Sequence, residues 1–85
     1  MSKITMYSKE TCPYCVHAEE LLHRKGVSDI AKINIEEYPH EMERMIARTG
    51  LRTVPQIFVG EIHVGGFDDL AALDRAGKLD PLLNA

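Results

Sequence analysis

The chain has 85 residues, 45% of them hydrophobic, and a formal net charge of −3. This length suffices for one globular domain, which we predict over residues 1–85. The acidic balance argues against nucleic acid as the main partner. Neither a long apolar run nor a signal-like N-terminus is found, so we expect no membrane span and a reducing, cytoplasmic compartment for the two cysteines.

The first elements are a strand and a helix that meet at the cysteines. Residues 3–7 alternate polar and apolar side chains and are rich in strand formers, which predicts a β-strand. From Pro13 onward the apolar residues follow helical spacing, and Gly26 marks the end of this helix. Thr11 is the expected N-cap. The cysteine pair therefore lies at the start of a helix that follows a strand.

This placement favours redox chemistry. Cys12 lies at the helix N-terminus, where free backbone N–H groups and the positive end of the helix dipole stabilise a thiolate. Lys9 adds a nearby cation, so we expect the pKa of the Cys12 thiol to fall below its free value of about 8.5. Cys15 lies one turn further along and should be more buried and less acidic. One cysteine can attack while the other resolves, as a dithiol catalyst requires.

Two other interpretations of the cysteine pair are weaker. A structural zinc ion needs four ligands, but the sequence has no second cysteine pair, and its histidines lack zinc-binding spacing. Inert structural cysteines are not expected around a proline at a strand-to-helix junction. A CxxC pair in a strand-helix-strand context is typical of redox proteins. We therefore expect catalysis by the cysteines and no bound metal.

The middle of the chain predicts a second strand and a second helix. Residues 29–35 alternate as a strand, which should be parallel to the first because a helix connects the two. Residues 41–49 carry apolar side chains at helical spacing. Pro39 can open this helix and Gly50 can close it.

The last third predicts a hairpin and a third helix. Residues 57–59 and 62–64 form the two antiparallel strands. Asp68 or Asp69 should cap the third helix, and residues 79–83 should add a last turn that seals the core. The order is strand, helix, strand, helix, strand, strand, helix. This order predicts an α/β thioredoxin-like fold, with a four-stranded mixed sheet in the order 2-1-3-4 flanked by helices on both faces.

Three segments carry a resemblance to a known family: residues 12–15 (Cys-Pro-Tyr-Cys), 53–55 (Thr-Val-Pro) and 65–69 (Gly-Gly-Phe-Asp-Asp). In this order and spacing the chain resembles the dithiol glutaredoxins over essentially its whole length, and most of all the short bacterial ones. The resemblance implies a cytoplasmic enzyme that reduces glutathione–protein mixed disulfides and protein disulfides. Glutathione would be its co-substrate, with no bound cofactor.

The resemblance also implies roles for individual residues. Cys12 would be the nucleophile that takes up glutathione, and Cys15 the resolving thiol. Val54 would pair with the backbone of glutathione ahead of a cis Pro55, and Asp68 would hold the γ-glutamyl end. The residues placed around glutathione in this way are Lys9, Tyr14, Thr53, Val54, Pro55, Gly66, Phe67 and Asp68.

The chemistry of glutathione supports these positions. It carries two carboxylates and one ammonium group, so a carboxylate fits the N-terminus of the third helix. Asp68 can meet the ammonium group in addition to capping the helix. Lys9 and Arg52 are the cations that can attract the ligand to an acidic protein. Two residues depart from the family: Phe67 replaces a small residue or cysteine of many relatives, and Met42 replaces a basic or amide side chain.

Three other functions remain open at this point. A related redoxin would be reduced by thioredoxin reductase, an iron–sulfur carrier would share a cluster between two protomers, and a binding module would not use its cysteines. Residues 65–69 argue against the redoxin, and Pro13 argues against the cluster carrier. We therefore expect a monomeric enzyme that acts with glutathione on glutathionylated or disulfide-containing proteins, without nucleic-acid or membrane partners.

Overall fold

The computed structural model describes residues 3–85. The elements in this part of the chain are β1 (Ile4–Ser8), α1 (Pro13–Arg24), β2 (Ile30–Asn34), α2 (Pro39–Thr49), β3 (Gln56–Val59), β4 (Ile62–Gly65), α3 (Phe67–Arg75) and α4 (Leu79–Leu83). The strands form one mixed sheet in the order β2-β1-β3-β4. β1 is parallel to β2 and antiparallel to β3, which pairs antiparallel with β4. The predicted fold class and sheet order are confirmed.

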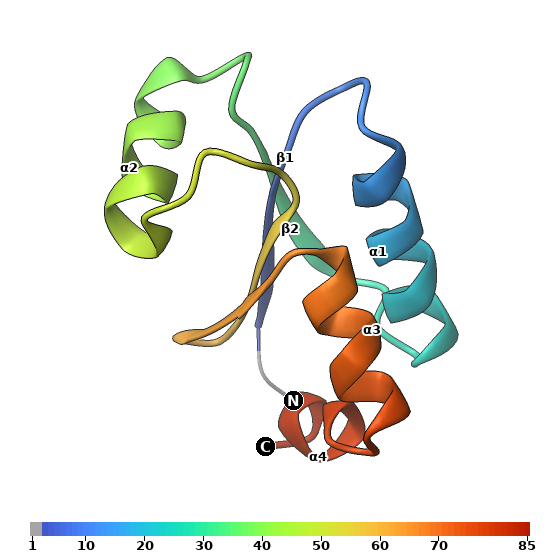
Figure 1. Cartoon of the computed structure of the whole chain (residues 1–85). Coiled ribbons are helices and arrows are strands. Elements are labelled where there is room, and N and C mark those ends of the chain that lie inside the picture. Colours follow the sequence, from blue (N-terminus) through green and yellow to red (C-terminus); the bar gives the residue numbers. More distant parts are fainter. Residues whose placement is uncertain (1–2) are drawn as a thin grey trace.

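The sheet separates two helical layers (Figure 1). α1 and α3 lie on one face and α2 lies on the other. Because successive strand residues point to opposite faces, Met6 of β1 belongs to the large apolar cluster under α1 and α3, whereas Tyr7 belongs to the smaller cluster beneath α2. In β3, Ile57 belongs to the large cluster and Phe58 to the smaller one. The central strands are therefore buried on both faces and hold the loops at their ends in place.

The element boundaries differ slightly from the predicted ones. β1 extends to Ser8, α2 already begins at Pro39, and β3 already begins at Gln56. The predicted last turn is the short helix α4, in which Leu79 and Leu83 are buried. Among residues 3–85, no helix has the length and apolar character needed to cross a membrane.

Candidate active site

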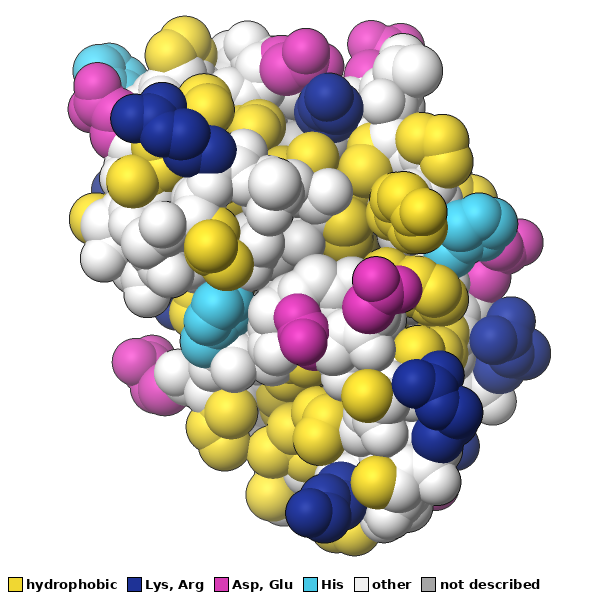
Figure 2. All heavy atoms as spheres, in the orientation of Figure 1, with side chains coloured by type: hydrophobic (Ala, Val, Ile, Leu, Met, Phe, Trp, Pro, Cys, Tyr) yellow, Lys and Arg dark blue, Asp and Glu magenta, His cyan; other side chains and the backbone are white. Residues whose placement is uncertain are grey.

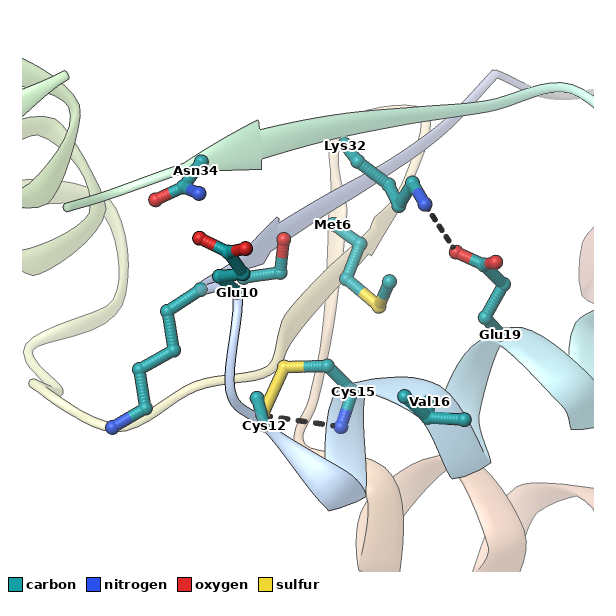
Figure 3. Close-up of a pocket in the computed structure, with 10 residues that line it drawn as sticks. Met6, Glu10, Cys12, Cys15, Val16, Glu19, Lys32 and Asn34 are labelled. Carbon is teal, nitrogen blue, oxygen red and sulfur yellow. Dashed lines mark hydrogen bonds and ion pairs between the residues drawn. A yellow bond between two sulfur atoms is a disulfide. The ribbon is translucent and has the colours of Figure 1, made fainter. Parts of the chain in front are cut away.

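Cys12 and Cys15 form a disulfide at the N-terminus of α1 (Figure 3). Cys12, rather than the predicted Thr11, is the N-cap, because Pro13 is the first helical residue. The backbone N–H of Cys15 donates to Sγ of Cys12 over 3.2 Å. In the reduced protein the same N–H group would stabilise a Cys12 thiolate. The expected difference in burial is small, with Cys12 7% and Cys15 5% exposed.

The segment around the Val54–Pro55 peptide bond, which is cis, lies against Cys12. The carbonyl oxygen of Val54 is 3.9 Å from Sγ of Cys12, although 42 residues separate the two in sequence. The sulfur of a disulfide carries no hydrogen, so this distance is a contact and not a hydrogen bond. It places the backbone of Val54 beside the sulfur that would carry a substrate.

A groove made of two adjoining pockets, its two parts, runs past this contact. One part, of about 280 Å³, is lined by all the predicted glutathione residues except Lys9, together with Leu51, Gln56 and Asp69. The other part, of about 540 Å³, is lined by Cys12, Lys9, Arg52 and Met42 among others. Tyr14, Thr53 and Val54 line both parts. The structure thus gathers the predicted residues around one groove that contains Cys12.

The N-terminus of α3 forms one end of the first part. Gly66 is its N-cap, and its backbone N–H donates to the Asp69 carboxylate over 3.0 Å. The capping carboxylate is therefore Asp69, and the expected capping role of Asp68 is wrong. Within residues 3–85, the Asp68 side chain makes no hydrogen bond or ion pair, and it is exposed. Its carboxylate remains available to a ligand.

Aromatic side chains form a wall beside the cysteines. Tyr14 stacks on Phe67 with ring centroids 6.3 Å apart, and the ring of His17 lies 5.8 Å from that of Phe67. Tyr14 is 60% exposed. Phe67 therefore contributes its ring to the site, and not only the backbone N–H group that a small residue would offer. The contact with His17 was not predicted, because it depends on how closely α1 and α3 approach each other.

Charges of both signs lie around the groove. Figure 2 shows a hollowed face between α2 and the layer of α1 and α3, with hydrophobic side chains in it and basic and acidic side chains at its border. The lining residues supply Lys9, Arg52 and one acidic residue, Glu36, at one part, and Asp68 and Asp69 at the other. This distribution matches a ligand that carries both carboxylates and an ammonium group.

A further cavity of about 280 Å³, which shares Lys9 and Cys12 with the larger part of the groove, reaches the disulfide between α1 and the strands β1 and β2 (Figure 3). Glu19 and Lys32 form an ion pair of 2.9 Å on its wall. Sequence analysis did not connect these two residues with the cysteines. In residues 3–85, no cluster of three or more His, Cys, Asp and Glu side chains is arranged to hold a metal ion.

Comparison with known proteins identifies the family. The glutaredoxin family model matches residues 4–64. Glutaredoxin 3 of Escherichia coli (strain K12) is 52% identical over 83 residues, which cover 98% of this chain and 99% of that protein. The glutaredoxin of Pseudomonas aeruginosa is 49% identical over 85 residues, the full length of both.

Solved structures agree with this result. The crystal structure of a buckwheat glutaredoxin–glutathione complex matches 98% of this chain and 77% of that chain, with 30% identity and a TM-score of 0.89. The family predicted from the three sequence segments is confirmed. The chain belongs to the glutaredoxin family, the glutathione-dependent thiol-disulfide oxidoreductases.

Proposed function

We propose that the protein reduces glutathione–protein mixed disulfides, with Cys12 as the nucleophile and glutathione bound in the groove beside it. The observation that carries this proposal is the position of Sγ of Cys12, at the N-terminus of α1 and 3.9 Å from the carbonyl oxygen of Val54. A glutathione sulfur attached to Cys12 would lie where the two parts of the groove meet.

The reaction would proceed through a mixed disulfide on the enzyme. The Cys12 thiolate attacks the glutathione sulfur of the substrate, the substrate disulfide breaks, and the protein thiolate leaves and takes a proton from solvent. The thiolate of a second glutathione then attacks the sulfur of the glutathione held on Cys12. Oxidised glutathione leaves, and the backbone N–H of Cys15 stabilises the regenerated Cys12 thiolate.

A protein disulfide would use both cysteines. Cys12 attacks one sulfur of the substrate, and Cys15 then attacks Sγ of Cys12 and releases the second substrate thiol. The product is the Cys12–Cys15 disulfide, the oxidised form seen in the structure. Glutathione would reduce it again in two exchange steps.

Glutathione would lie in the groove as an extended peptide. Its cysteine backbone would pair with Val54 as a short added strand. Its γ-glutamyl carboxylate would meet the N-terminus of α3, where Gly66 and Phe67 lie, and its ammonium group would meet Asp68. Tyr14, Thr53 and Pro55 would border the bound peptide, and Lys9 and Arg52 would attract its glycyl carboxylate.

We further expect glutathionylated and disulfide-containing proteins as partners, a monomer, no bound cofactor, and a cytoplasmic setting that keeps glutathione reduced. The redoxin alternative gains no support from the groove, because its charges fit glutathione. A cluster carrier would also bind glutathione, and Pro13, directly after Cys12, argues against it.

The test is the reduction of a small glutathione mixed disulfide with glutathione as the sole reductant. Wild type and Cys15→Ser should turn over, and Cys12→Ser should be inactive. Reduction of a protein disulfide should require both cysteines. An inactive wild type that instead accepts electrons from thioredoxin reductase would replace this proposal with the redoxin alternative.

A further inference from the structure

Hydrogen bonds connect the edge strand β4 with the proposed glutathione groove. Nε2 of His63 lies 2.7 Å from Oε1 of Gln56, and Nε2 of Gln56 donates to the carbonyl oxygen and to Oγ1 of Thr53, over 3.0 and 3.2 Å. Gln56 is 2% exposed, whereas Thr53 is exposed and lines both parts of the groove. A buried amide thus joins an imidazole outside the groove to a hydroxyl within it.

The chemistry of the groups fixes which atom donates in each of these hydrogen bonds. The carbonyl oxygen of Thr53 carries no hydrogen, so the Gln56 atom that faces it must be the amide nitrogen. Oε1 of Gln56 therefore faces His63 and accepts, which places the donated proton on Nε2 of His63. An amide nitrogen cannot accept a hydrogen bond, so the Thr53 hydroxyl accepts from Gln56. The proton of that hydroxyl is left to point elsewhere.

We propose that His63 and Gln56 are positioning residues that make the Thr53 hydroxyl a hydrogen-bond donor to a carboxylate or carbonyl oxygen of bound glutathione. This inference rests on the proposed function, which places glutathione in this groove. Each bond polarises the next along the series from His63 to Gln56 to Thr53, so the hydroxyl becomes a better donor than an isolated one. The same bonds hold the backbone of Thr53, next to Val54.

The imidazole is itself held by its surroundings. His63 is the cross-strand partner of Phe58, and their rings stack with centroids 5.0 Å apart. The guanidinium of Arg48 lies 3.8 Å from the centroid of the Phe58 ring and donates to the Tyr7 hydroxyl over 3.1 Å. Tyr7 and Phe58 are both buried. His63 itself is exposed, but its ring lies against a buried side chain, so its position does not depend on the ligand.

The first test is His63→Phe, which keeps a ring against Phe58 but removes the donor. We expect the KM for the glutathione mixed disulfide, whose glutathione part occupies the groove, to rise about 2- to 10-fold, the effect of one hydrogen bond, with kcat unchanged. Thr53→Val should have a similar effect. The matched control is Ile62→Thr, because Ile62 is exposed on the same edge strand and lines neither part of the groove. Its KM should equal that of wild type.

The second test is the double variant His63→Phe/Thr53→Val. If the two residues act through one series of bonds, its KM should be no higher than that of Thr53→Val alone. Additive effects, or an unchanged KM in His63→Phe, would overturn the inference. Reduction of the Cys12–Cys15 disulfide by dithiothreitol needs no glutathione groove, so a parallel loss of that rate would indicate a merely structural role and also overturn it. Failure of the proposed function itself would differ, because wild type would then not reduce the glutathione mixed disulfide with glutathione at all.

Discussion

Replacing Gly65 with alanine should disturb both the stability of the protein and the end of the groove. Gly65 has a φ of 116°, which L side chains rarely adopt, and a Cβ at this position would lie 2.9 Å from Cγ of Asp69. The Asp69 carboxylate would have to move, and it is the acceptor of the Gly66 N–H group. The substitution therefore combines backbone strain with the loss of the cap of α3.

The size of the effect follows from these two causes. An unfavourable φ costs about 1–2 kcal/mol, and a lost helix cap costs about 0.5–2 kcal/mol, so Gly65→Ala should lower the free energy of unfolding by about 1.5–4 kcal/mol. A domain of this size is stable by roughly 4–13 kcal/mol, so the variant should still fold. Gly60→Ala is the matched control, because Gly60 has a φ of 60° but no atom within 4 Å of its Cβ position. It should show only the strain.

Urea unfolding of both variants measures the difference between their free energies of unfolding. Steady-state kinetics of mixed-disulfide reduction measure the effect on the groove. Gly65→Ala should raise the KM for the glutathione mixed disulfide, because the N–H groups at the start of α3 lose their arrangement, whereas Gly60→Ala should not. Asp69→Ala removes the obstacle, so in that background Gly65→Ala should cost less than it does in the wild-type background, because only the backbone strain remains. Equal destabilisation by the two glycine substitutions in the wild-type background would refute the reasoning, as would an unchanged KM in Gly65→Ala.

Two further predictions concern charged residues. Asp68→Asn should raise the KM for the glutathione mixed disulfide about 10-fold or more, because a hydrogen bond to a charged group contributes about 1.5–3 kcal/mol. The Asp68 side chain has no partner within residues 3–85, so the free energy of unfolding in urea should fall by no more than about 1 kcal/mol, the contribution of a carboxylate in the first turn of α3. A larger loss of stability would contradict this assignment. The hydrogen bond to Asp74, reinforced by Asp80, raises the pKa of Lys25 above its ordinary value of 10.5. Its stabilisation should therefore be present below pH 10.5 and disappear as the pH rises through the higher folded pKa. Lys25→Met should be less stable than wild type in urea at pH 8, with a smaller difference at pH 11, and a difference independent of pH would refute this role.

The fold could be predicted because its signals are local and mutually consistent. Alternation identified the strands, helical spacing and glycine stops identified the helices, and a helix between two strands made those strands parallel. The boundaries depended on pairing that no local pattern reveals: Ser8 belongs to β1 because it pairs with Asn34, and Gln56 belongs to β3 because it pairs with Tyr7. The N-cap of α1 was misplaced because residue preference favoured the Thr11 hydroxyl, although a proline at the first helical position makes the residue before it the cap.

The groove could be predicted from three segments, but the hydrogen bonds behind it could not. The hairpin was predicted to begin at residue 57, which left Gln56 outside the sheet. Side chains two residues apart in a strand share a face, so Gln56 and Phe58 lie on the same face of β3. Phe58 pairs with His63 on the neighbouring strand, which places the His63 side chain on that face too. A buried amide in a central strand must satisfy its donors and its acceptor, and His63 and Thr53 are the partners within reach. A polar residue at a core position of a strand is therefore the useful signal in the sequence. Its hydrogen-bond partners are the residues that position the site.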